Sequence, residues 1–530
     1  MKLRLIQISF AVALAVHGLA QADDTKSQTG PLGKVSFPTS CDSKVQPAFE
    51  RAVAMLHSFW YSAGEKAFRD VLKDDPQCAI AAWGIASILM SNPLAGQGAS
   101  PKGAEEAQAA IDEGRRIGAK TERERDYIEA VAAYYKDFAT RPEKERQAVR
   151  AKAYEALAQK YSTDDEAQIF FALYLAGTQT QADQTYAAYL KAAAILEDEF
   201  KKYPDHPGVA HYLIHSYDAP PIADKGLAAA RKYAGIAPAA PHALHMPSHI
   251  FTRVGSWQES AATNARSQEV AKAGNEPDEA YHATDYMVYA YLQLARDAEA
   301  RRSIDEAMKI TGSNPARFTA PYAIAAMPAR YAFERGAWQE AAKLQPIGST
   351  YPFVEAITYF TRSVGAARSG DLAGARKDAA ELESIHKALL AAKNTYWATE
   401  VEVQRLAAAG WIALGEGKSD EAVKLMRAAA DLEDHNEKHI VTPGRIVPAR
   451  ELLGDMLLEL KQPDAALKEY EASQQREPNR FRNYLGSARA AEMAGDRAKA
   501  AAYYQKLLAL AKDADTARPE LESAKKLASR

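Results

Sequence analysis

Two stretches near the end of the chain decide its fold class: QPDAALKEYEASQQREP (residues 462–478) and GDRAKAAAYYQKLLAL (residues 495–510). Each places an aromatic residue four positions after an alanine, and these two alanines, Ala466 and Ala500, are 34 residues apart. Residues four apart lie one above the other on a helix. Each stretch therefore predicts an amphipathic helix that belongs to a repeated unit.

A second pair of segments supports the repeat. HMPSHIFTRVGSWQES (residues 245–260) aligns with AMPARYAFERGAWQEA (residues 326–341), so that Trp257 matches Trp338. Alanine is abundant, and the pattern is broken by single Gly and Pro residues rather than by strand-like runs of Val, Ile and Thr. The sequence predicts an all-α protein built from repeated helical hairpins.

A 34-residue unit with this cadence of Gly, aromatic, small residue and Pro resembles the tetratricopeptide repeat family, over most of the chain from FWYSAGEKAFRDVLKDDP (residues 59–76) onwards. The phrases HSFWY (57–61) and VAHYLIHSYD (209–218) also resemble a group of exported bacterial proteins with these repeats. The resemblance implies an α-solenoid, a superhelix whose groove is lined by the first helix of each hairpin. It implies binding in general and no particular activity.

The beginning of the chain is typical of a secretion signal. Lys2 and Arg4 precede an apolar run, and a small-x-small pattern ends at Ala22. We expect residues 1–22 to be removed by cleavage after Ala22, residues 23–40 to form a flexible segment, and the mature protein to be periplasmic or secreted. No later stretch approaches about 18 apolar residues, so no transmembrane segment is expected.

The charge balance gives no case for a nucleic-acid partner. The chain has 66 basic and 69 acidic residues and a formal net charge of -3, whereas nucleic-acid binding favours a marked basic excess.

The chain has two cysteines, Cys41 and Cys78. An even number in an exported protein favours a disulfide over two buried thiols, and both interpretations stay open at this point. A bond requires the two Cα atoms to lie within about 7 Å.

The mature chain divides into three sets of repeats. We assign residues 41–205 to N-terminal repeats, 206–312 to a histidine-rich central part and 313–530 to C-terminal repeats. Breaks in the array are expected near residues 271–279 and 434–446.

Seven of the 12 histidines lie in the central part. The repeat register places six of them on the groove face of three consecutive helices: His211, His215, His242, His245, His249 and His282. Two pairs are four residues apart, the spacing at which two imidazoles on one helix face can bind one ion. Six imidazoles suit zinc, copper, iron or nickel far better than calcium or magnesium, and we expect copper or zinc. We predict a transition-metal site, with nuclearity left open.

Three neighbours of the histidines are candidates for an outer layer or a groove wall: Asp285, Tyr289 and Arg330. Whether the protein is an enzyme stays open. It is a metal-dependent enzyme of copper oxidase or hydrolytic type, a metal-binding protein, or a metal-free scaffold that holds a peptide or small molecule in the groove. No fingerprint of a nucleotide cofactor is present. His57 is expected to be structural.

Overall fold

The computed structural model describes residues 30–528, which form helices and no strand. The predicted all-α architecture is confirmed. The predicted signal peptide, its cleavage site and the first part of segment 23–40 lie outside the described residues. Among the described helices none is both long and apolar enough to cross a membrane.

The helices are grouped by the three parts of the chain that were assigned from the sequence. The N-terminal group contains α2 (Gln46–His57), α3 (Tyr61–Asp74), α4 (Ile80–Leu89), α5 (Pro101–Ile117), α6 (Glu122–Tyr135), α7 (Glu143–Lys160), α8 (Asp165–Ala176) and α9 (Ala187–Lys202). The central group contains α10 (Pro207–Ser216), the short helix η1 (Ala223–Gly226), α11 (Leu227–Ile236), α12 (Pro241–His245), α13 (Pro247–Arg253), α14 (Trp257–Ala273), α15 (Pro277–Gln293) and α16 (Asp297–Ala307). The C-terminal group contains α17 (Thr319–Glu334), α18 (Trp338–Ala341), α19 (Pro352–Arg368), α20 (Leu372–Ala391), α21 (Thr395–Gly415), α22 (Ser419–Asp434), α23 (Ala449–Glu459), α24 (Pro463–Gln474), α25 (Phe481–Met493), α26 (Arg497–Leu510) and α27 (Pro519–Leu527).

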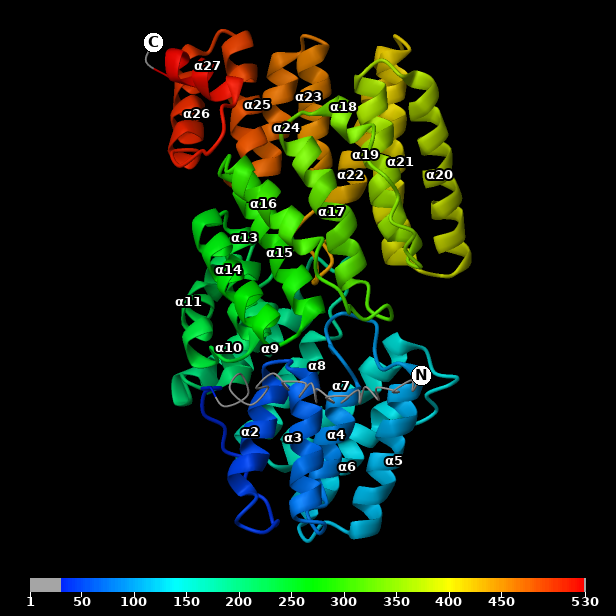
Figure 1. Ribbon diagram of the computed structural model, residues 1–530, viewed down its shortest axis with the longest axis vertical. Coiled ribbons are helices and arrows are strands. Elements are labelled where there is room, and N and C mark those ends of the chain that lie inside the picture. Colours follow the sequence, from blue (N-terminus) through cyan, green and yellow to red (C-terminus); the bar gives the residue numbers. More distant parts are fainter. Residues whose placement is uncertain (1–29, 529–530) are drawn as a thin grey trace, which may run out of the picture.

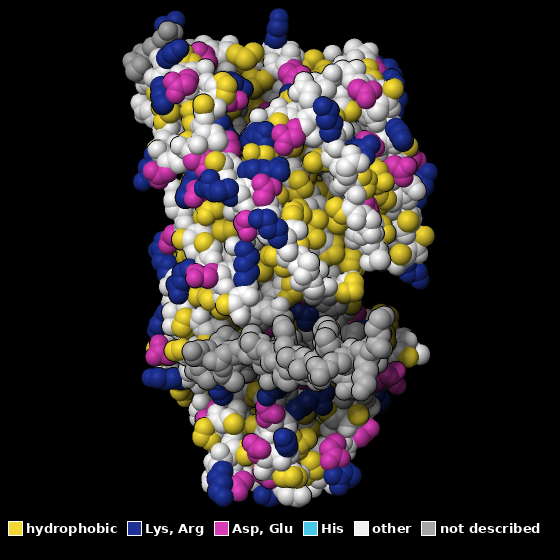
Figure 2. Space-filling model, in the orientation of Figure 1, with side chains coloured by type: hydrophobic (Ala, Val, Ile, Leu, Met, Phe, Trp, Pro, Cys, Tyr) yellow, Lys and Arg dark blue, Asp and Glu magenta, His cyan; other side chains and the backbone are white. Residues whose placement is uncertain are grey.

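Helices that follow one another in sequence pack against each other, so the chain is a stack of helical hairpins. Figure 1 shows the N-terminal helices at the lower end of a long molecule, the central helices in the middle and α19–α27 at the upper end. On the face shown in Figure 2, basic and acidic side chains are interspersed. The predicted helical-hairpin arrangement is therefore confirmed.

Glycine turns explain the repeat seen in the sequence. Gly255 and Gly336 occupy the same place in the two aligned segments, between α13 and α14 and between α17 and α18, with φ of +70° and +62°. A left-handed backbone of this kind costs a residue with a Cβ about 1–2 kcal/mol, so glycine is favoured at each turn. A Cβ on Gly255 would also lie 2.6 Å from the Pro478 carbonyl oxygen.

The structure agrees with one of the two predicted breaks in the repeat array and not with the other. Residues 435–448 between α22 and α23 form an irregular segment, as expected for 434–446. The break expected near 271–279 is wrong, because α14 runs to Ala273 and α15 begins at Pro277 after a short turn. Proline is well suited to the first turn of a helix, so Pro277 starts α15 rather than interrupting the array.

The C-terminal helices also contact the central helices, which lie about 200 residues earlier in the chain. The Trp257 indole donates to the Asn479 carbonyl at 2.7 Å, and Tyr289 donates to Glu477 at 3.1 Å. The 435–448 segment links the two main cores, since Ile440 packs in the N-terminal core and Ile446 in the C-terminal core.

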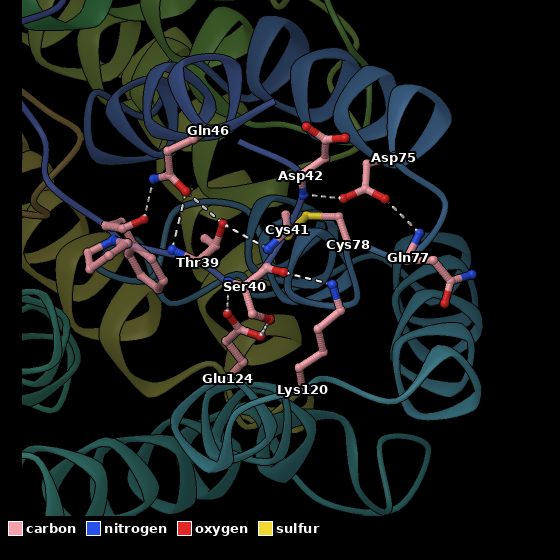
Figure 3. Close-up of a disulfide and its surroundings, with 12 residues drawn as sticks. Thr39, Ser40, Cys41, Asp42, Gln46, Asp75, Gln77, Cys78, Lys120 and Glu124 are labelled. Atoms are coloured by element: carbon pink, nitrogen blue, oxygen red, sulfur yellow. Dashed lines mark hydrogen bonds between the residues drawn. A yellow bond between two sulfur atoms is a disulfide. The ribbon is translucent and has the colours of Figure 1, made fainter. Parts of the chain in front are cut away.

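Cys41, just before α2, and Cys78, just before α4, form a disulfide with Cα atoms 4.7 Å apart (Figure 3). Ser40 beside it donates through its hydroxyl to Glu124 at 2.6 Å, and the Asp42 amide donates to the Asp75 carboxylate at 2.7 Å. These contacts fasten the entry to the first helix onto α6 and the α3–α4 turn.

Candidate metal centre

The six histidines predicted as ligands converge in the interior, and none is more than 7% exposed. They form two groups, in each of which one donor atom per residue lies within 4.8 Å of the others. The first trio is His211 and His215 from α10 with His242 from α12, and the second trio is His245 from α12, His249 from α13 and His282 from α15.

In the second trio, His245 and His249 both have Nδ1 engaged by an oxygen. His245 Nδ1 lies 2.7 Å from Asn264 Oδ1, and the NH₂ group of Asn264 donates to the Ser260 carbonyl, which fixes Oδ1 as the atom facing the ring. His249 Nδ1 lies 2.9 Å from Asp218 Oδ2. Because these oxygens only accept, each Nδ1 carries the hydrogen of its neutral ring.

The Nε2 atoms of the same two rings are consequently unprotonated, and they lie 3.1 Å apart. Neither ring has a hydrogen left to bridge them, and the Tyr286 hydroxyl, 3.5 Å from His249 Nε2, donates to the Thr442 carbonyl instead, so two lone pairs face each other in the interior. A buried acceptor without a donor costs about 1–3 kcal/mol. A cation between them removes that cost, because two nitrogens bound at about 2.0–2.1 Å to a tetrahedral ion are about 3.3 Å apart.

Burial keeps these rings neutral. It lowers the pKa of His249 to about 4 and that of His282 to about 3. It also holds the pKa of His211, His215 and His245 well below the ordinary value of 6.5. Ligation requires an unprotonated nitrogen, so the rings are in the metal-binding form at neutral pH.

The first trio has similar outer partners. His211 Nδ1 lies 2.6 Å from the carbonyl oxygen of His57, one of the last carbonyls of α2 that the helix itself leaves unpaired. His242 Nδ1 lies 3.1 Å from Glu279 Oε2. His211 Nε2 lies 3.1 Å from His215 Nε2, and a hydrogen on His215 can bridge this pair. The second trio is therefore the stronger indication of a metal site.

Two ring nitrogens of the first trio, His242 Nε2 and His215 Nδ1, are buried without a hydrogen-bond partner among the described residues. Native proteins satisfy most buried polar atoms with protein groups, water or ions, and these two nitrogens are available to such a partner. Oxygen partners on Nδ1 with a free Nε2 form the pattern by which metal-binding histidines are oriented.

The two trios are adjacent. The rings of His215 and His249 are 5.4 Å apart between centroids, and those of His242 and His245 are 5.9 Å apart. Three protein ligands at each site leave a coordination position open on each ion. Two neighbouring ions held in this way can share a small bridging ligand.

The histidines do not line an open groove, which corrects the expectation from the repeat register. The 435–448 segment lies over them: the Thr442 carbonyl accepts from Tyr286 at 2.9 Å, and Tyr286 stacks edge-on against His245 at 4.6 Å. Lys438 Nζ lies 3.1 Å from Asp218. The repeat register identified the helix face that carries the histidines, but it did not predict that the 435–448 segment covers this face.

The three outer candidates bond to groups other than the histidine rings: Asp285 and Arg330 hold the covering segment, and Tyr289 contacts the turn between α24 and α25. Asp285 pairs with Arg330, which donates to the Gly444 carbonyl at 2.9 Å. Tyr289 bonds with Glu477 at 3.1 Å and accepts from Arg480. Asp285 therefore does not orient a histidine ring.

Sequence reasoning missed Glu279 and Asn264 as orienting groups. Glu279 lies three residues before His282 on the same helix, a spacing that could have signalled a shared face. Asn264 comes from α14 and has no comparable signal, because its place opposite His245 depends on how two helices pack.

A further group, His57, Glu166 and His206, lies where the N-terminal part meets the start of α10 and is also compact enough for a metal. Here every ring nitrogen has a partner: His57 contacts Glu166 and the Tyr212 hydroxyl, both at 2.9 Å, and His206 contacts Glu166 at 3.0 Å and accepts from the Val209 amide. Despite the opposing effect of burial, the two histidines hold the pKa of Glu166 down at about 2. This cluster is satisfied as it stands and gives no sign of a ligand.

No protein-family model matches the chain. No curated protein matches it either. Among solved structures it is similar to a chain of the APC/C hetero-tetramer Cut9-Hcn1, at 14% identity and a TM-score of 0.29 over 92% of this chain and 95% of that one. It is also similar to the human IFIT1 dimer with PPP-AAAA, at 13% identity and a TM-score of 0.36 over 77% and 87%. At these scores the likenesses carry no argument about the site.

Proposed function

We propose that this is an exported tetratricopeptide-type protein that holds transition-metal ions, copper or zinc, in two adjacent three-histidine sites. The facing Nε2 atoms of His245 and His249 carry this proposal, because both rings keep their hydrogen on Nδ1 and only a cation reconciles the two lone pairs.

The donor set favours copper or zinc. All six candidate donors are imidazoles, whereas Asp218 and Glu279 contact Nδ1 atoms and so lie outside the donor set. Imidazole suits copper and zinc, while calcium and magnesium prefer oxygen ligands.

Metal analysis tests the proposal directly. The protein is purified from the periplasm without a histidine tag, and bound copper and zinc are measured per chain. We expect up to two ions per chain and the loss of one in His245→Ala. An exported protein that contains no stoichiometric metal and takes up neither ion would refute the proposal and favour a metal-free scaffold for a peptide or small molecule.

The contact between the trios favours a second candidate function, an oxygen-activating copper pair. The six imidazoles would hold two copper(I) ions, which together would supply the two electrons that reduce dioxygen to the peroxide level, and an ortho-diphenol would return two electrons and two protons on oxidation to a quinone. A hydrolytic centre would more often recruit carboxylate ligands. Oxygen consumption by the copper-loaded protein with simple phenols separates this activity from simple metal storage.

A further inference from the structure

A cavity of about 140 Å³ lies between the start of α3 and the start of α15, beside the first trio. Its walls include the aromatic residues Phe59, Trp60 and Tyr61, and its polar lining consists of Ser62, His242, Glu276, Glu279 and Arg317. Ser62 is exposed, whereas His242 is buried. The cavity therefore reaches from the surface to a candidate ligand.

The lining carries more negative than positive charge, with the two carboxylates of Glu276 and Glu279 against the guanidinium of Arg317. The Trp60 indole donates to Glu276 Oε1 at 3.0 Å, and the Ser62 hydroxyl donates to the same oxygen. These bonds hold the carboxylate in place and fall on one oxygen. A cleft with a net negative charge raises the local concentration of cations.

His242 joins the cavity to the metal centre. Its Nδ1 contacts Glu279 at 3.1 Å, and its buried Nε2 has no hydrogen-bond partner in the described part of the chain. The Phe59 ring lines the cavity and also contacts the trio, with its centroid 5.5 Å from that of His242 and 4.4 Å from that of His211.

We propose that this cavity is the entry port for the metal ions, with Glu276 and Glu279 as a transient site for a hydrated divalent transition-metal cation and His242 as the first nitrogen ligand. Carboxylates replace water around the ion, and His242 then draws it past Phe59 into the first trio. This inference rests on the proposed function of the trios.

Stopped-flow loading of the metal-free full chain with cobalt(II) tests the port, because visible absorption reports cobalt bound by nitrogen ligands. Ser62→Trp narrows the mouth at an exposed position, and Glu276→Gln removes one charge. Glu269→Gln, an exposed carboxylate on the neighbouring α14, is the matched control.

We expect Ser62→Trp to slow both cobalt uptake and its release to a chelator by about the same factor, on the order of tenfold, with unchanged stoichiometry and affinity. A purely structural effect would change the affinity instead. Glu276→Gln should slow uptake in a salt-dependent way, and Glu269→Gln should behave as wild type.

If wild type binds cobalt and both port variants load at its rate, the port inference is wrong and ions enter elsewhere, for example by opening of the 435–448 segment. If wild type binds no metal at all, the proposed function itself fails. Slowed uptake in Glu276→Gln alone still supports the port, should Ser62→Trp not fold.

Discussion

Replacing His249 by asparagine should remove a metal ligand at unusually small cost to the metal-free protein. Asparagine places its amide nitrogen near the position of Nδ1, so the bond to Asp218 is retained while Nε2 is lost. The lone-pair conflict with His245 disappears with it. Relief of a buried unsatisfied acceptor contributes about 1–3 kcal/mol and offsets much of the cost of the small cavity.

His57→Asn is the matched control, since the same atoms are removed from an equally buried ring. There the lost Nε2 is the one that contacts the buried Glu166 carboxylate at 2.9 Å. A hydrogen bond to a charged group contributes about 1.5–3 kcal/mol. The cost of the cavity cancels in this comparison, because both variants lose the same ring atoms. The relieved acceptor in one variant and the lost hydrogen bond in the other together make metal-free His249→Asn more stable than His57→Asn by at least about 2 kcal/mol.

Urea unfolding of both metal-free variants gives this difference, and metal analysis gives the second readout. We expect His249→Asn to lose one ion per chain, and His57→Asn to keep full stoichiometry despite its lower stability. The reasoning is refuted if the two variants are equally destabilised, or if His249→Asn retains every ion that wild type binds.

Three further predictions test the outer layer, the disulfide and the covering segment. Asn264→Leu frees the tautomer of His245, so metal affinity should fall about 10–100-fold in a competition titration while the metal-free fold persists; an unchanged affinity would contradict this role. Replacing Cys41 and Cys78 by serine removes a disulfide that spans 37 residues. The free energy of unfolding, measured in urea under oxidising conditions, should fall by about 4 kcal/mol, while wild type taken through the same buffer exchange should not change. Burial lowers the pKa of His439 from 6.5 to about 3, so the unfolded chain takes up a proton at a higher pH than the folded chain does. The free energy of unfolding of the metal-free protein should therefore fall as the pH drops from 6.5 towards 3. In urea unfolding at a series of pH values, the metal-free His439→Gln variant should lose less of this free energy, by up to about 1.4 kcal/mol per pH unit.

The helical hairpins were predictable because their rules are local. Alanine and aromatic residues recur at helical spacing, and glycines such as Gly255 and Gly336 mark turns that require a left-handed backbone. The grouping of histidines on one inner face followed from the same register. What lies opposite that face did not, because the 435–448 segment comes from far along the chain and has no helical period of its own.

The orienting groups show the same division between local and long-range information. Glu279 lies on the same helix as His282, so the sequence alone could have placed both side chains on one helix face. Asn264, by contrast, meets His245 across a helix pair, and the His57 carbonyl reaches His211 from a helix some 150 residues earlier. Only packing in three dimensions brings these partners together.

The position of the covering segment would couple the proposed metal centre to the stability of the whole molecule. Ile440 packs in one main core and Ile446 in the other, while Lys438 reaches the carboxylate that holds His249. A metal that binds only the folded state stabilises it by about 4 kcal/mol at a thousandfold excess over Kd. Because the bound trio must be intact for this gain, the stabilisation falls on the junction where the two cores meet. The metal-free protein should therefore open first at the 435–448 segment, with faster amide exchange at Thr442 and its neighbours that metal suppresses.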